Sequence, residues 1–169
     1  MGIGDLITTI LKRINRMQRW FVALVLVASL LTGTSFGQAA KAEKSLYDRL
    51  GGKPAVDAVA SGLVDRILKD TRVNKWFTHA AASPENTKAY KATLADFICV
   101  AVGGPCKYTG ADMVTAHKGR GVTSAAFDAV AEDLAAQLDQ LKVPAKEKKE
   151  VMDLVGTLKR SIVQSSSQQ

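Results

Sequence analysis

Apolar residues recur every three to four positions from Ser45 onward, which is the spacing of one face of an α-helix. Glycines, prolines and short polar runs separate these periodic segments, as turns separate packed helices. The apolar–polar alternation of a half-buried strand does not compete with this pattern. The sequence therefore predicts an all-α domain, with no internal repeat and no second domain.

Caps and helix breakers divide this domain into separate helices. Ser45 is a typical N-cap, Gly51 and Gly52 end the first helix, and Gly103, Gly104 and Pro105 end the third. The segment KWFTHAAASPEN, residues 75–86, is predicted as a connection. The expected helices cover residues 45–50, Pro54 to about 69–74, 87–102, a short helix with Met113 and His117, Ser124 to about Leu141, and Lys146 to about Val163.

The three longest of the later helices each have one apolar face, which we expect to point into the core. The predicted inward residues are Tyr90, Leu94, Phe97, Ile98 and Ala101, then Phe127, Val130, Leu134, Leu138 and Leu141, then Val151, Leu154, Val155, Leu158 and Ile162.

Residues 1–42 have the pattern of a targeting segment rather than of a folded domain. A basic stretch, RINRMQR, precedes the apolar run WFVALVLVASLL and then small and polar residues. The pattern predicts export from the cytoplasm, with cleavage before Glu43 or after Ala39. Alternatively, residues 20–36 form an uncleaved membrane anchor, which would leave the protein facing the periplasm. The folded domain is expected over residues 43–163, followed by a disordered tail at 164–169.

The formal net charge of +7 arises mainly in this leader. Residues 1–42 contain five basic residues and one acidic residue, and the remainder contains 18 basic and 15 acidic residues. No block of like charge with interleaved aromatic residues stands out in the remainder, so we expect no nucleic-acid binding. Walker, GxGxxG, HExxH and CxxC motifs are also missing from the sequence.

One of the two histidines, His117, lies in the stretch DMVTAHKGRGVT, directly before a basic turn with two glycines. A histidine at this place is compatible with an ordinary helix end, a metal ligand or a catalytic base. The local sequence does not choose between these roles.

Five motifs in order along the chain resemble the group I truncated haemoglobins: LYDRLGG, WF, GGPCKYTG, MVTAHKGRGVT and FDAVAEDL. The similarity extends from about Ser45 to Val163. It implies a truncated globin fold, in which a two-over-two helical sandwich surrounds haem b, with His117 as the proximal iron ligand. Ferrous haem iron is held by a neutral imidazole whose second nitrogen needs a hydrogen-bond acceptor.

The same resemblance implies the walls of the haem pocket. Phe77 matches an aromatic residue that wedges against the porphyrin, although Trp76 and Phe77 are equally compatible with plain core. Phe97 matches an inward aromatic residue of the distal helix, and Tyr108, Lys107 and either Lys118 or Arg120 are candidates to meet a propionate. The implied proximal wall comprises Met113, Val122, Phe127 and Val130, for which ordinary core packing is the alternative.

On the distal side the chain departs from the commoner family pattern. Aligned on GGPCKYTG, Tyr90 takes the position that faces the iron, whereas Val64 stands where many relatives have a tyrosine. Tyr90 is the candidate donor to a bound ligand, unless it lies at the pocket rim with its hydroxyl in water. Thr93 and Leu94 follow in the next turn, and Thr93 replaces a histidine that some relatives use as a sixth ligand.

The second histidine, His79, is expected at the surface, because a ligand role would require the connecting segment to fold inward. Cys99 and Cys106 flank the Gly-Gly-Pro break, seven residues apart. In a reducing compartment they would be small apolar residues, whereas after export they would tend to form a disulfide. They are not haem-attachment cysteines, because CxxCH is missing.

These features predict a haem protein that binds dioxygen reversibly at ferrous iron. The main alternative is an enzyme that oxidises nitric oxide to nitrate, or reacts with peroxide or nitrite, with electrons from a separate reductase. A haem-based sensor or haem-holding protein is a third class, and a helical bundle without cofactor is a fourth.

Overall fold

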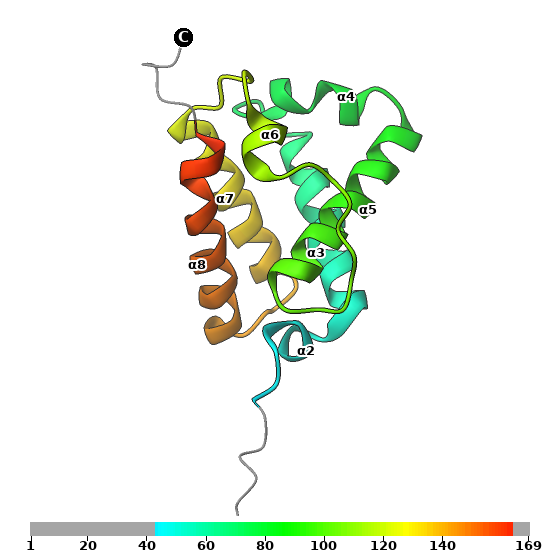
Figure 1. Cartoon of the computed structure of the whole chain (residues 1–169), viewed down its shortest axis with the longest axis vertical. Coiled ribbons are helices and arrows are strands. Elements are labelled where there is room, and N and C mark those ends of the chain that lie inside the picture. The colour runs from blue at the N-terminus through cyan, green and yellow to red at the C-terminus, as the bar shows by residue number, and fades with distance from the viewer. Residues whose placement is uncertain (1–42, 164–169) are drawn as a thin grey trace, which may run out of the picture. The chain divides into compact units, whose positions relative to one another are not determined.

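A computed structural model describes residues 43–163, all of whose regular elements are helices (Figure 1). The all-α prediction is therefore confirmed, whereas the predicted leader at 1–42, the alternative anchor at 20–36 and the tail at 164–169 lie outside the described residues. Within residues 43–163, no helix combines the length and apolar character needed to cross a membrane. The elements are α2 (Leu46–Leu50), α3 (Gly52–Ile67), the 3₁₀ helix η1 (Asn74–Phe77), α4 (Thr78–Ala81), α5 (Pro84–Ala101), α6 (Met113–His117), α7 (Ser124–Gln140) and α8 (Ala145–Ile162).

Side-chain caps determine where four of these helices begin. Each cap is a Ser, Thr or Asp whose oxygen accepts a hydrogen bond from the backbone N–H three residues later, which would otherwise lack a partner. The capping residues are Ser45 for α2, Ser83 for α5, Asp112 for α6 and Thr123 for α7. Gly51, whose φ of 107° lies in the left-handed region, ends α2 and leads directly into α3.

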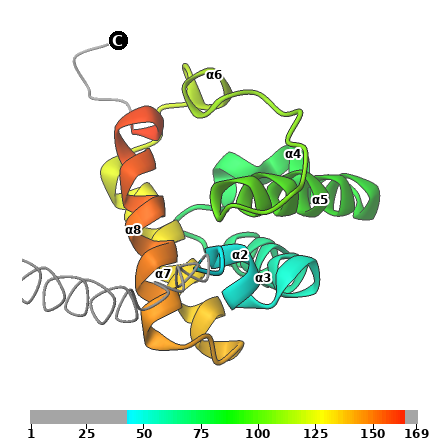
Figure 2. The ribbon, with the colours of Figure 1, turned by 60° about the horizontal axis from the view of Figure 1, so that its bottom comes forward.

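The long helices form two crossed pairs. Helix α3 packs against α5, and α7 packs against α8. The contact between α3 and α7 joins the pairs, and Figure 2 shows that one pair runs across the other. The short helix α6 packs against α8. This two-over-two arrangement confirms the predicted truncated globin fold.

The crossing of α3 and α7 is close because Gly62 faces Gln137. The Gln137 side chain is only 4% exposed, and it donates to the Ala58 carbonyl (3.3 Å) and accepts from Arg66 Nε (3.2 Å). A Cβ at Gly62 would lie 2.1 Å from the Gln137 side chain. The two helices therefore need a residue without a side chain at this point.

Two kinds of prediction about the helices were wrong. The segment 75–86, expected as a plain connection, contains most of η1, all of α4 and the start of α5. Leu141 and Leu154, expected inward, are 39% and 38% exposed, and Ala101 is also exposed. Leu141 is the C-cap of α7, one residue beyond the helix. Leu154 and Ala101 line a surface hollow instead of the core.

Candidate functional site

His117 is the last residue of α6, and the local sequence controls how its ring is presented. The Asp112 carboxylate accepts from the Thr115 N–H (3.0 Å) and so starts the helix. The backbone leaves the helical conformation at Lys118, and Gly119 and Gly121 then adopt positive φ values of 73° and 62°. This tight turn ends α6 directly after the histidine.

The half-buried imidazole of His117 has one nitrogen engaged and one available. Its Nδ1 lies 2.8 Å from the carbonyl oxygen of Met113. Because a carbonyl only accepts, Nδ1 carries the proton, and Nε2 therefore has a free lone pair. This is the orientation in which a neutral histidine binds a metal through Nε2, with its second nitrogen fixed by a backbone carbonyl.

A haem fits this single ligand better than a metal ion bound by the protein alone. Residues 43–163 contain no group of three or more His, Cys, Asp or Glu side chains that could hold a metal ion. A porphyrin supplies four nitrogen ligands of its own and needs only one axial side chain from the protein. His117, with Nδ1 held by the Met113 carbonyl, therefore suits the single axial position of an iron porphyrin.

Some of the residues predicted around the porphyrin pack in one hydrophobic cluster, and others lie outside it. Val122 and Phe127 are buried, and Met113 and Val130 are half-buried. One hydrophobic cluster brings together the side chains of Phe77, Tyr90, Leu94, Val122 and Val130, which come from η1, α5, the α6–α7 turn and α7. The side chains of Phe97, Met113 and Phe127 do not belong to that cluster.

Tyr90, the candidate distal donor, packs its ring edge-on against Phe77, with 5.9 Å between ring centroids. Burial raises the pKa of the Tyr90 phenol to about 12, although the nearby Arg120 charge acts in the opposite direction. The hydroxyl makes no hydrogen bond to any other residue within 43–163. Tyr90 thus carries a protonated, unengaged donor in a largely apolar setting. On α3, Val64 is fully buried and offers no second donor.

Tyr108, Thr93 and His79 are the other polar residues that were considered near the pocket, and none of them has a hydroxyl or ring placed as a free donor inside it. The Tyr108 ring packs edge-on against Phe97 (5.4 Å between centroids), and its hydroxyl donates to the Ala111 carbonyl (2.7 Å), so its proton is not free for a propionate. Thr93 is exposed, and its hydroxyl donates to the Ala89 carbonyl (3.0 Å). His79 is also exposed, which confirms its predicted surface position.

Sequence reasoning missed a contact that joins η1 to the turn after α6. Trp76 Nε1 donates to the Arg120 carbonyl at 2.9 Å. The contact ties the segment that carries Phe77 to the turn that follows His117. Trp76 was considered only as plain core together with Phe77. A partly buried indole N–H generally needs an acceptor, and this was the available signal.

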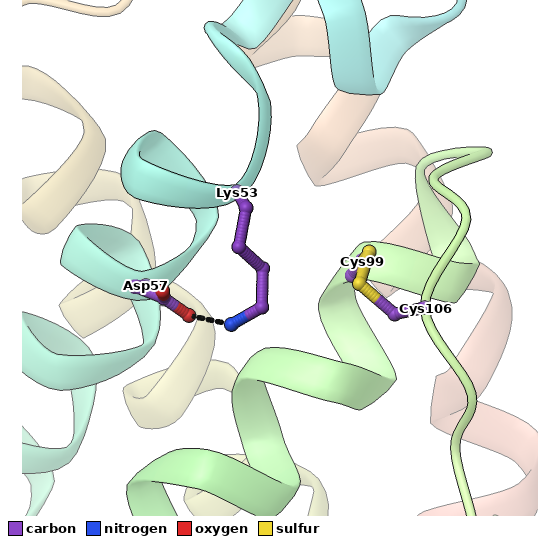
Figure 3. The surroundings of a disulfide bond; sticks show 4 residues. All are labelled: Lys53, Asp57, Cys99 and Cys106. Carbon is purple, nitrogen blue, oxygen red and sulfur yellow. Dashed lines mark hydrogen bonds and ion pairs between the residues drawn. A yellow bond between two sulfur atoms is a disulfide. The ribbon is translucent and has the colours of Figure 1, made fainter.

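A disulfide joins Cys99 near the end of α5 to Cys106 in the loop that leads to α6 (Figure 3). The two Cα atoms are 5.9 Å apart, and Cys99 is completely buried. Gly104, between the cysteines, is so tightly packed that a Cβ there would lie 2.6 Å from Cys99 Sγ and 2.5 Å from the Tyr47 ring. The disulfide therefore fixes the chain between the candidate distal and proximal helices.

The surface hollow of about 360 Å³ lies elsewhere, and none of the predicted site residues lines it. Its lining comes from α2, the end of α5 and α8: Leu46, Ala101, Val102, Glu150, Asp153, Leu154 and Thr157. Its carboxylates already have partners, because Glu150 binds Arg49 and Asp153 binds Lys149 (2.5 Å). We therefore place the candidate site at His117 and Tyr90 rather than in this hollow.

Comparison with known proteins gives the same assignment. The family model for bacterial-like globins matches residues 45–164. Group 1 truncated hemoglobin GlbN of Mycolicibacterium paratuberculosis is 36% identical over 114 residues, which cover 68% of this chain and 80% of the relative. Group 1 truncated hemoglobin GlbN of Synechocystis is 36% identical over 104 residues, or 59% and 80% of the two chains.

Solved structures show the same similarity in three dimensions. The Fe(III) form of truncated hemoglobin from Tetrahymena pyriformis superimposes with a TM-score of 0.64 at 28% identity, covering 72% of this chain and 100% of that one. The 2/2 hemoglobin from Synechococcus, solved in the cyanomet state with covalently attached heme, gives 0.60 at 33% identity, covering 70% and 95%. The chain therefore belongs to the bacterial-like globin family, and its sequence and fold place it with the group 1 truncated haemoglobins.

Proposed function

We propose that this globin binds haem b through His117 and binds dioxygen reversibly at the ferrous iron. The observation that carries the proposal is the hydrogen bond from His117 Nδ1 to the Met113 carbonyl (2.8 Å), which leaves Nε2 as an oriented, neutral ligand. Haem would supply a redox-active iron with one coordination position open to a diatomic gas.

The chain's own residues have three tasks in this function. His117 holds the metal and is kept in one tautomer by Met113. Tyr90 is the hydrogen-bond donor toward the gas, and its raised pKa, about 12, keeps the phenol protonated at neutral pH. Phe77 and Leu94, which belong to the same hydrophobic cluster as Tyr90, would keep water away from the bound gas.

Absorption spectra of the ferric, ferrous and oxygenated forms test the haem assignment. We expect His117→Ala to lose or shift the Soret band, because it removes the proximal ligand. His79→Ala is the matched control: it removes the other imidazole, which is exposed, and should leave the spectrum unchanged. Circular dichroism of both variants shows whether they fold. A normal Soret band in folded His117→Ala would refute the ligand assignment.

Stopped-flow measurement of oxygen release tests the role of Tyr90. The loss of one net hydrogen bond of about 1.4 kcal/mol corresponds to a roughly tenfold faster release in Tyr90→Phe. Tyr108→Phe is the control, because its hydroxyl is already bound to the Ala111 carbonyl and should not affect release. An unchanged release rate in Tyr90→Phe would show that Tyr90 does not donate to the gas.

The second candidate function is the oxidation of nitric oxide to nitrate with electrons from a separate reductase. The exposed basic residues Lys118 and Arg120, which lie in the turn after His117, support this candidate because they suit an acidic reductase. Rapid loss of the oxygenated spectrum on mixing with nitric oxide, followed by its return when reductant is supplied, would support the enzyme. A slow or unrecovered loss would favour a carrier of dioxygen.

For the cellular location, we propose that the protein is exported and resides in the periplasm or is anchored facing it. The leader pattern in residues 1–42 supports this proposal, and so does the Cys99–Cys106 disulfide, since disulfides persist mainly in oxidising compartments. Fractionation of cells that express the full chain tests it. Recovery of the protein only from the cytoplasm would refute export.

A further inference from the structure

Two segments without acidic residues meet beside His117. Residues 71–84 and residues 113–127 contain no Asp or Glu, although they contain several lysines and arginines. The hydrogen bond from Trp76 Nε1 to the Arg120 carbonyl (2.9 Å) joins the two segments. The sequence and the fold therefore concentrate positive charge at this place.

Three of the four cations at this junction have no carboxylate partner, whereas the fourth, Arg72, pairs with Asp70 (2.8 Å) and Glu132 (2.6 Å). Lys75, Lys118 and Arg120 are exposed, and none of them forms an ion pair with another residue in the described part of the chain. Several other cations of the domain are neutralised, as in the pairs Lys148–Asp139 (2.5 Å) and Lys159–Asp128 (2.6 Å). We call Lys75, Trp76, Lys118 and Arg120 the basic rim.

Trp76 makes the basic rim a formed surface rather than a set of loose charges. Lys75 Nζ lies 4.2 Å from the centre of the Trp76 ring, and the edge of the same ring is held by the Arg120 carbonyl. Tryptophan and arginine are the residues most enriched at protein-binding hot spots, whereas isolated solvated charges contribute little there.

The basic rim directly adjoins the candidate iron ligand. The Arg120 N–H donates to the His117 carbonyl at 3.1 Å, so the rim and the ligand belong to one turn. In Figure 1, this turn between α6 and α7 lies at the end of the domain opposite α2.

We propose that the basic rim is the docking surface for an acidic, one-electron donor protein that carries a reduced flavin. Opposite charges would steer the donor to the turn that carries His117. There, one electron leaves the reduced flavin and converts ferric iron to ferrous iron, and no bond is made or broken. This inference rests on the proposed haem function, because it requires an iron centre at His117.

The test uses the full haem-loaded chain and photoreduced flavodoxin as an acidic probe. The variant Lys75→Glu/Lys118→Glu reverses two charges of the basic rim. Because Lys118 directly follows His117 and is also a candidate to meet a propionate, Lys75→Glu alone is measured beside it. Lys44→Glu/Lys142→Glu is the matched control, since both lysines are exposed and neither forms an ion pair within residues 43–163. Lys44 directly precedes the N-cap of α2, and Lys142 lies between α7 and α8. Reduction of ferric iron is followed by stopped flow at several salt concentrations, and flavodoxin binding is measured separately by isothermal titration.

We expect the rim variant to be reduced at least about tenfold more slowly at low salt, to lose the salt dependence and to bind flavodoxin more weakly. The control should behave like the unmodified chain, and free dihydroriboflavin should reduce all forms equally. Equal flavodoxin rates and affinities for both variants would overturn the proposal. The proposal would also be overturned if the rim variant kept its flavodoxin kinetics and lost affinity for haem or for phosphatidylglycerol vesicles instead.

The two proposals fail in different ways. A chain that takes up no haem, or whose ferrous form does not bind dioxygen, contradicts the proposed function. Titration with flavodoxin would still report whether the basic rim docks an acidic protein. Conversely, normal oxygenated spectra with no effect of charge reversal on binding or reduction would contradict only the docking surface.

Discussion

The Cys99–Cys106 disulfide should contribute measurably to the stability of the domain. The bridge closes a short loop with a sequence separation of 7. In the chain-entropy model, closing a loop of this size stabilises the folded state by about 2.4 kcal/mol at 25 °C, because it restricts the unfolded chain. For a domain of this size, this corresponds to roughly 10 °C in melting temperature.

The cleanest perturbation is Cys106→Ser, because Cys106 is half-buried whereas Cys99 is completely buried. Replacing Cys99 would add a packing loss to the loss of the bridge. Urea unfolding, followed by circular dichroism at 222 nm in one haem state, gives the free energy of unfolding with and without a phosphine reductant. We expect the free energy of unfolding to fall by about 2.4 kcal/mol in the reduced protein and by the same amount in Cys106→Ser.

The control is Cys106→Ser itself, whose stability should not respond to the reductant. If the oxidised and reduced forms of the unmodified chain agree within about 0.5 kcal/mol, the reasoning fails. Other contacts, such as Gly104 against Tyr47 and the Tyr108 hydroxyl on the Ala111 carbonyl, would then hold the loop without the bridge.

Three further predictions concern packing and protonation. Gly62→Ala should lower the free energy of unfolding by about 1–3 kcal/mol, because the new Cβ would lie 2.1 Å from a buried amide group on α7. Gly156→Ala, in open space on α8, should raise the free energy of unfolding by about 0.5–1 kcal/mol. If urea titrations gave the same change for Gly62→Ala and Gly156→Ala, the close crossing of α3 and α7 would be contradicted. The Arg49 guanidinium lowers the pKa of Glu150 below its ordinary 4.5, so this pair stabilises the fold above about pH 4.5 and loses its effect as the pH falls through the folded pKa. Glu150→Gln should therefore make thermal stability less dependent on pH between about pH 5 and 3, and an unchanged slope would show that the pair is not coupled to folding. Because burial raises the pKa of Tyr90 to about 12, oxygen release should not vary from about pH 6 to 10, and a titration in that window that disappears in Tyr90→Phe would refute the protonated donor.

The positions of the helices and of the candidate ligand were accessible from the sequence. Ser45 begins α2 through a hydrogen bond from a backbone N–H three residues later, and Gly51 and Gly52 end it through their positive φ angles. These local effects operate in any tertiary context. The same holds for His117, since Asp112 begins its short helix and Gly119 helps to end it. The 3.6-residue period was sufficient to predict an all-α domain.

The tertiary structure decided which polar side chains meet and which apolar residues stay at the surface. From the sequence, Tyr90 was compatible with either the edge of the haem pocket or its interior. Its contact with Phe77 depends on how η1 approaches α5. Leu154 lies on an apolar helical face, but no layer of the domain covers it. The contact between Trp76 and Arg120 joins segments 44 residues apart. Such contacts depend on the crossing of the two helix pairs, and a helical period specifies which residues share a face without specifying what packs against it.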